Sequence, residues 1–84
     1  MKLLYRWFKS EPPLISREAA LTIAQDECKR RQWVWREPVE IKLHFGQWRI
    51  YTNSKGRGVN ARIAIDSQTG EILEAFLRQD SVEV

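Results

Sequence analysis

Cys28 and His44 are the two side chains of this 84-residue sequence with the chemistry of a nucleophile and its general base. Cysteine catalysis needs the imidazole within hydrogen-bond reach of the thiol and a third group that orients the ring. Cys28 falls on the apolar face of a predicted helix, where a thiol is usually inert packing. His44 falls on the polar side of a predicted strand, and no carboxylate is placed to orient it. We therefore expect no catalytic pair.

Paired carboxylates, metal ligands and phosphate loops are the other chemistries to consider. Glu71 and Glu74 occupy opposite sides of one predicted strand, so they do not converge as paired-carboxylate hydrolysis requires. No group of potential ligands has the spacing of a metal site. The segment Lys55-Gly56-Arg57-Gly58 lacks the G-x-x-x-x-G-K-[ST] order of a phosphate-binding loop. The sequence predicts no enzyme, no cofactor and no metal.

Basic and aromatic residues gather at the end of the predicted helix and in a predicted loop. Such mixtures bind nucleic acids, because cations contact phosphates and aromatic rings stack on bases. A structural explanation ranks ahead of this one: cations suit a helix C-terminus, the tryptophans pack under the following loop, and the loop is a solvated hairpin loop. The candidate binding surface comprises Lys29, Arg30, Arg31, Trp33, Trp35, Lys55 and Arg57.

Composition indicates one globular domain in a reducing compartment. The single cysteine excludes an internal disulfide, and small secreted domains usually need such links. No apolar run approaches the roughly 18 residues of a membrane span. The apolar run at residues 3–5 is too short for a signal peptide, so we expect a cytoplasmic protein. The net charge of +3 permits acidic partners without requiring them.

A helix is predicted from Ser16, a good N-cap, to the basic run Lys29-Arg30-Arg31. Its apolar face is formed at helical spacing by Ala20, Ile23, Ala24 and Cys28. From residue 39 the apolar period changes from 3.6 to 2, which predicts strands over 39–45, 48–52 and 59–65. A polar, glycine-containing loop is predicted over 53–58.

The turns and the last strand complete the predicted sheet. Gly46-Gln47 is predicted to form a type II′ hairpin turn, since its glycine comes first. Asp66, Thr69 and Gly70 are predicted to build a structural turn from side-chain bonds and a positive φ. The strand over 71–78 is apolar on both sides, which favours a central or doubly covered position.

The predicted fold is α+β, with one helix on a four-stranded antiparallel meander sheet in two layers. The domain spans 14–78, after a basic and aromatic arm at 1–13 and before a frayed tail at 79–84. The arm could lie on an anionic membrane surface through Trp7 and Phe8. We favour its folding back onto the domain, because burying two rings stabilises a small core.

Three segments together resemble the PepSY domain, named for peptidase propeptides and a sporulation protein. They are the helix at 15–24, the hairpin segment at 46–52, and the strand-turn-strand Ala61–Leu73 with its Asp-x-x-Thr-Gly-Glu turn. The resemblance covers about residues 14–78. It implies a half-cystatin-like module that inhibits or restrains a peptidase, and it implies no catalytic residues. Bacterial immunity proteins of the nuclear-transport-factor-like type carry a similar helix and turn.

Our first functional hypothesis is a non-catalytic module that binds a protein or peptide through its sheet face or an open sheet edge, as a homodimer or a peptide complex. It could be regulatory or inhibitory toward a peptidase-like partner. The alternative is a nucleic-acid-binding domain that uses the basic helix end and the basic loop. Acidic residues on the predicted strands, Glu40, Glu71 and Glu74, argue against a stacking platform.

Overall fold

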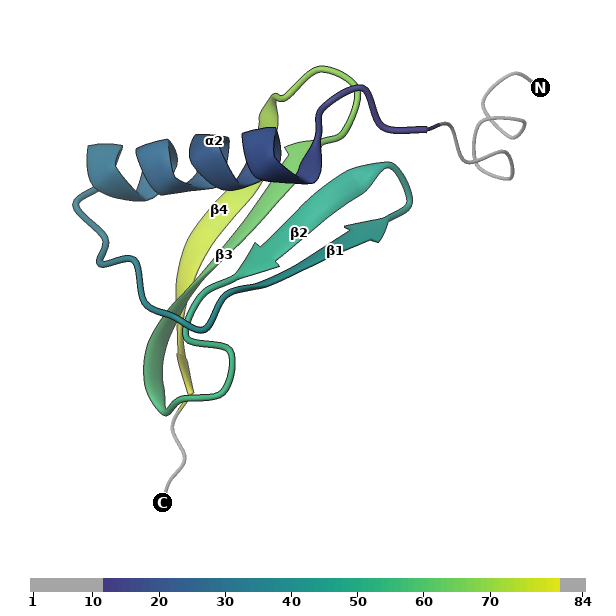
Figure 1. Cartoon of the computed structure of the whole chain (residues 1–84). Helices are drawn as coiled ribbons and strands as arrows, with labels where there is room; N and C mark the ends of the chain where they lie inside the picture. The colour runs from purple at the N-terminus through teal and green to yellow at the C-terminus, as the bar shows by residue number, and fades with distance from the viewer. Residues whose placement is uncertain (1–11, 81–84) are drawn as a thin grey trace.

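The computed structural model describes residues 12–80, which form one helix packed on a four-stranded antiparallel sheet (Figure 1). The elements in chain order are α2 (Arg17–Arg30), β1 (Glu40–His44), β2 (Gln47–Tyr51), β3 (Gly58–Asp66) and β4 (Ile72–Asp80). Each strand pairs with the next one in the sequence, in the order β1-β2-β3-β4. The predicted two-layer α+β meander is therefore confirmed.

α2 begins and ends through local hydrogen bonds. The Ser16 hydroxyl accepts the Ala19 backbone N–H at 3.0 Å, which confirms the predicted N-cap. At the other end Gln32 has a left-handed φ of 63°, and the N–H groups of Gln32 and Trp33 donate to the carbonyls of Lys29 and Cys28 at 3.1 and 2.8 Å. These bonds form a Schellman motif, with a glutamine at the position that usually holds glycine.

The core lies between α2 and one face of the sheet. Ala20 and Ala24 of α2 are fully buried, so the helix backbone approaches the sheet closely. Ile50 and Ile63 are neighbours across β2 and β3 and supply the largest buried side chains together with Ile65. Trp48 packs at the margin and donates its indole N–H to the Ile15 carbonyl at 2.8 Å. The helix is thus fixed to β2 by apolar contact and by one long-range hydrogen bond.

The first hairpin turn differs from the prediction. Its central residues are Phe45 and Gly46, both with positive φ, 49° and 76°, and Gln47 already belongs to β2. This is a type I′ turn closed by the pair His44–Gln47. Both possible turns keep the same residues facing α2, because they differ by a two-residue shift in register. Alternation of apolar residues therefore does not distinguish them.

The turn between β3 and β4 is built as predicted. The Asp66 carboxylate accepts the backbone N–H groups of Gln68 and Thr69 at 2.8 and 3.2 Å. The Thr69 hydroxyl accepts the N–H of Glu71 at 3.1 Å, and Gly70 has a φ of 81°. The structural role assigned to Asp66, Thr69 and Gly70 is confirmed.

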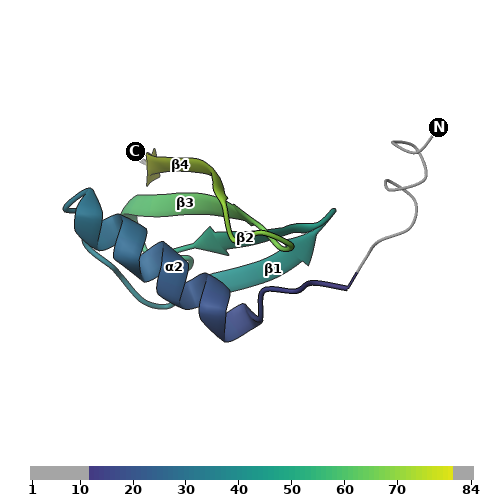
Figure 2. The same ribbon diagram turned by 90° about the horizontal axis from the view of Figure 1, so that it is seen from above.

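β4 was predicted to be central or doubly covered, and this prediction is wrong. β4 is an edge strand of the sheet, and α2 packs on β2 and β3 (Figure 2). The strand also continues to Asp80, two residues beyond its predicted end. Its apolar residues on both sides therefore indicate exposure at an edge and not burial between layers.

The predicted arm falls largely outside the described residues. Residues 1–11 and 81–84 are not described, so the packing or membrane contact of Trp7 and Phe8 lies outside this structure. Pro12 belongs to the described part, and its carbonyl accepts the Gln68 side-chain amide at 2.7 Å. The chain therefore enters the domain alongside the β3–β4 turn.

Candidate protein interface on the open face and edge of the sheet

The basic cluster at the end of α2 is paired within its own helix. Arg30 and Arg31 both form ion pairs with the carboxylate of Glu27, which is buried. Hydrogen bonds from Arg30 and then Arg31 hold the pKa of Glu27 below the usual range of a glutamate. Lys29 is exposed. The charges of the two arginines therefore serve the helix end, and the sequence reasoning did not identify Glu27 as their common partner.

The two tryptophans that follow the helix pack against the core. Trp33 and Trp35 are half-buried and contact the buried cluster beneath α2. The Arg31 guanidinium lies 4.9 Å from the centre of a Trp33 ring, a cation–π contact. Both indoles pack against the core, as the structural explanation for them predicted.

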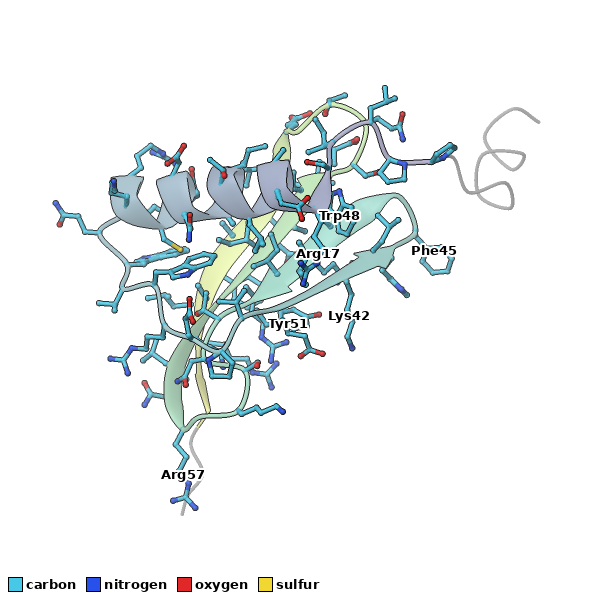
Figure 3. All side chains as sticks on the ribbon, viewed as in Figure 1. Arg17, Lys42, Phe45, Trp48, Tyr51 and Arg57 are labelled. Carbon is cyan, nitrogen blue, oxygen red and sulfur yellow. The ribbon has the colours of Figure 1, made fainter. Side chains whose placement is uncertain are left out.

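The basic loop lies elsewhere on the molecule. Lys55 and Arg57 are exposed, and Figure 3 shows Arg57 at the end of the molecule remote from α2. Asn53, in a left-handed conformation, donates its side-chain amide to the carbonyls of Arg57 and Val59 at 3.0 and 3.2 Å. The loop is therefore an organised turn around a buried asparagine. Arg57 therefore lies apart from the cations at the end of α2.

The candidate nucleophile and base are also separate. Cys28 lies in the core under α2, and burial, followed by the nearby Glu27 carboxylate, raises the pKa of its thiol. His44 is exposed at the end of β1, with its ring 4.4 Å from that of Phe45. Across residues 12–80, no three His, Cys, Asp or Glu side chains are grouped so that they could hold a metal ion.

The sheet face opposite α2 has no covering layer among the described residues. Figure 3 shows Lys42 and Tyr51 on this side and Trp48 on the helix side. Neighbouring strands place Arg49, Ala64 and Glu74 in one row across the sheet. Because alanine is the small residue in the middle of the row, the face is hollowed there. The resulting pocket has a volume of about 140 Å³.

Cations and aromatic rings surround this pocket. The next row contains Tyr51, Arg62 and Phe76, with the Arg62 guanidinium 4.6 Å from the Tyr51 ring centre. Arg49 also lines the pocket, and its Nε is buried without a hydrogen-bond partner among the described residues. An unpaired buried donor costs about 1–3 kcal/mol, so among the described residues the open face has one unsatisfied polar atom near the exposed ring of Phe76.

The free edge of β4 presents a defined set of backbone groups. The Thr52 N–H donates to the Ala61 carbonyl at 3.0 Å and the Ala61 N–H donates to the Thr52 hydroxyl at 2.8 Å, so Ala61 faces β2. The backbone N–H and C=O groups of successive residues point to opposite sides of a strand. Those of Arg62 therefore point toward β4, and those of its partner Phe76 point toward β3. The backbone groups of Ala75, Leu77 and Gln79 therefore point away from the sheet.

Large apolar side chains accompany these outward backbone groups. Leu73, Phe76 and Leu77 are 45%, 41% and 44% exposed. β4 has nine residues, whereas the other edge strand, β1, has five and carries an ion pair between Lys42 and Glu40 at 3.3 Å. Exposed, long, apolar edges are the ones that accept another strand. The sequence signal is the apolar pattern on both sides of β4, which on sequence grounds favours burial.

Comparison with family models, with curated proteins and with solved structures finds no match to this chain. Within residues 12–80 no helix has the length and apolar character needed to cross a bilayer.

Proposed function

We propose that this chain is a non-catalytic protein-binding module that accepts an extended strand of a partner along the free edge of β4. The observation that carries the proposal is the combination, on one nine-residue edge strand, of outward backbone groups and exposed apolar side chains. In strand addition the backbone bonds supply affinity and alternate side chains supply specificity. β4 offers both between Glu74 and Gln79, which follow the register shift that its pairing with β3 shows at Ala64/Ile65.

The two faces of the sheet favour different side chains of the incoming strand. On the open face, the added strand lies beside Glu74 and Phe76, which already line the pocket. On the helix face, the added strand lies beside Ala75 and Leu77, the latter left uncovered by α2. We therefore expect the partner to place apolar residues toward the helix layer and a mixed polar and aromatic set toward the open face.

A regulatory role toward a peptidase-like partner is consistent with this mode of binding. The likeness to PepSY domains implies such a role, and the three apolar side chains exposed on β4 provide a surface for it. Nucleic-acid binding has less support, because Arg30 and Arg31 pair with Glu27 and Arg57 lies at the end of the molecule remote from α2.

The test compares two variants of Leu77 that differ in one backbone donor. Leu77→Ala and Leu77→Pro both remove the exposed side chain, but only proline also removes the outward N–H. Proline is tolerated in edge strands where the N–H faces solvent. Melting curves followed by circular dichroism establish that both variants fold.

The probe is a set of twelve-residue peptides selected from a random display library against the intact protein. We expect wild type and Leu77→Ala to bind them, Leu77→Pro to lose binding, and the amides of Ala75 and Gln79 to gain hydrogen-exchange protection in the complex. Peptides that protect only α2 or β1 would contradict the proposal. Equal binding by the alanine and proline variants would contradict it as well.

A further inference from the structure

We infer that the strand accepted by β4 is β4 of a second copy of this chain, paired antiparallel so that Phe76 lies opposite Phe76 of that copy. This inference rests on the proposed function and names its partner. A two-fold axis at Phe76 would join the two sheets into one continuous sheet. The interface would be isologous, since each copy offers the same edge.

The open-face residues of β4 are complementary to themselves under this pairing. Glu74, Phe76 and Arg78 alternate along the strand on the face opposite α2, each paired across to β3. An antiparallel two-fold reverses their order, so Glu74 of each copy meets Arg78 of the other, and the two Phe76 rings meet at the axis. Opposite charges directly across strands are stabilising, and like charges are destabilising. The symmetric interface therefore contains two favourable charge pairs around one aromatic pair.

Other two-fold registers lack this complementarity. A register centred on Leu77 places Arg78 opposite Phe76, so Glu74 has no basic residue across from it. A register centred on Ala75 places Glu74 opposite Phe76, so Glu74 again has no basic residue across from it. Of the three registers, the one centred on Phe76 is the one that sets Glu74 opposite Arg78.

The backbone directions agree with the same register. The backbone N–H and C=O of Phe76 point toward β3. The two Phe76 residues that meet at the axis therefore form a non-hydrogen-bonded pair. Such pairs bring their Cα atoms to about 4.5 Å and their side chains into closest contact. The outward backbone N–H and C=O groups of Ala75 form hydrogen bonds with those of Leu77 of the second copy. By symmetry, those of Leu77 bond Ala75 of the second copy.

The helix side of the interface is open to a second copy. Figure 2 shows β4 at the edge of the sheet that lies farthest from α2. Leu77, exposed on this side, would lie across from the smaller Ala75 of the other copy. Each leucine therefore gains apolar cover without a clash between two large side chains.

The charge pairs provide a test by reversal. Glu74→Arg places arginine opposite Arg78 of the second copy, and Arg78→Glu places glutamate opposite Glu74, each time at both symmetric positions. By sedimentation equilibrium we expect a wild-type dimer, and for each single variant a dissociation constant raised roughly tenfold or more. An equimolar mixture of the two variants should form a mixed dimer, since every pair across that interface is again opposite in charge. The double variant Glu74→Arg/Arg78→Glu should dimerise like wild type.

Cysteine cross-linking tests the register independently of charge. Phe76→Cys brings two thiols to a Cα separation within the range that a disulfide spans. Arg78→Cys is the matched control, because its two copies lie about 14 Å apart along the strands. We expect oxidation to give a covalent dimer with Phe76→Cys and not with Arg78→Cys. Cys28 is buried in both proteins and does not compete.

The outcomes separate this inference from the proposed function. Single variants that dimerise as tightly as wild type, or that fail to form a mixed dimer, would overturn the inference. So would a monomeric wild type. If that monomer still binds display peptides in a manner lost in Leu77→Pro, the proposed function stands and only the second copy is wrong. If no binding of either kind depends on the Leu77 N–H, both are wrong. Glu74→Gln and Arg78→Gln, with circular dichroism, control for loss of folding.

Discussion

Replacing Thr52 by valine removes one hydroxyl from the interior and keeps the shape of the side chain. Thr52 is buried, and its Oγ1 accepts the backbone N–H of Ala61 at 2.8 Å. Valine offers no acceptor, so the buried N–H of Ala61 loses its partner. A buried donor without a partner costs about 1–3 kcal/mol. For a domain of this size each kcal/mol lowers the melting temperature by about 4–8 °C.

The free energy of unfolding is measured by urea denaturation, followed through the fluorescence of the four tryptophans. We expect a lower midpoint with an unchanged dependence on urea, since the surface exposed on unfolding is the same. Thr52→Ser keeps the hydroxyl and separates the hydrogen bond from the loss of a methyl group. Thr22→Val is the matched control on the exposed side of α2, where the hydroxyl bonds the Glu18 carbonyl at 3.2 Å.

The control variant should change the free energy of unfolding by less than about 0.5 kcal/mol, as surface substitutions usually do. If Thr52→Val is no more destabilising than Thr22→Val, the hydroxyl does not satisfy the Ala61 N–H in solution. The direction assigned to the backbone groups of Ala61 would then rest on the bond from the Thr52 N–H to the Ala61 carbonyl alone.

Three further predictions concern α2. Gln32→Gly should raise the melting temperature by a few degrees, because glycine relieves the left-handed φ of 63° at the helix end, and a drop on thermal melting would contradict this. Because Arg30 and Arg31 hold the pKa of Glu27 below its usual value, their stabilising effect is complete above the pKa of an unfolded glutamate and is lost as the pH falls through the lower folded value. Urea titrations should therefore show that the wild type has a higher free energy of unfolding than Glu27→Gln at pH 7, and that this difference shrinks at pH 3. An equal difference at both pH values would refute this prediction. The Cys28 thiol, buried and with its pKa raised by that burial, should react with an aromatic disulfide reagent at a rate that follows global unfolding in urea, and fast labelling of the folded protein would show otherwise.

The parts of the fold that depend on neighbouring residues were predicted from the sequence. The Ser16 cap and the Asp66 turn bond backbone groups two or three residues away, so residue type and spacing determine them. The hairpin turn at Phe45 was missed because a shift of two residues leaves every side chain on the same face. The edge position of β4 was missed because an apolar pattern on both sides does not distinguish cover by protein from exposure at an edge.

The candidate site depended on contacts between distant residues, and little of it was predicted. The sequence singled out the basic groups near residues 30 and 56 because they are contiguous, yet Arg57 lies apart from the cations at the end of α2. The pocket on the open face requires Arg49, Ala64 and Glu74 to meet in one row, and each comes from a different strand. Strand alternation gives the face of each residue, but only the register shows which residues become neighbours.

The anchoring of the chain beside the β3–β4 turn has a mechanical consequence. Pro12 is held at that turn through Gln68, whereas Asp80 pairs with Gly58 at the opposite end of β3. The nine residues of β3 separate these two points by roughly 30 Å. Tension applied between residues 12 and 80 therefore runs nearly parallel to β3 and β4 and loads their hydrogen bonds together, in shear. Bonds loaded together resist more force than bonds opened one after another, so the domain should extend late when it is pulled from these two points.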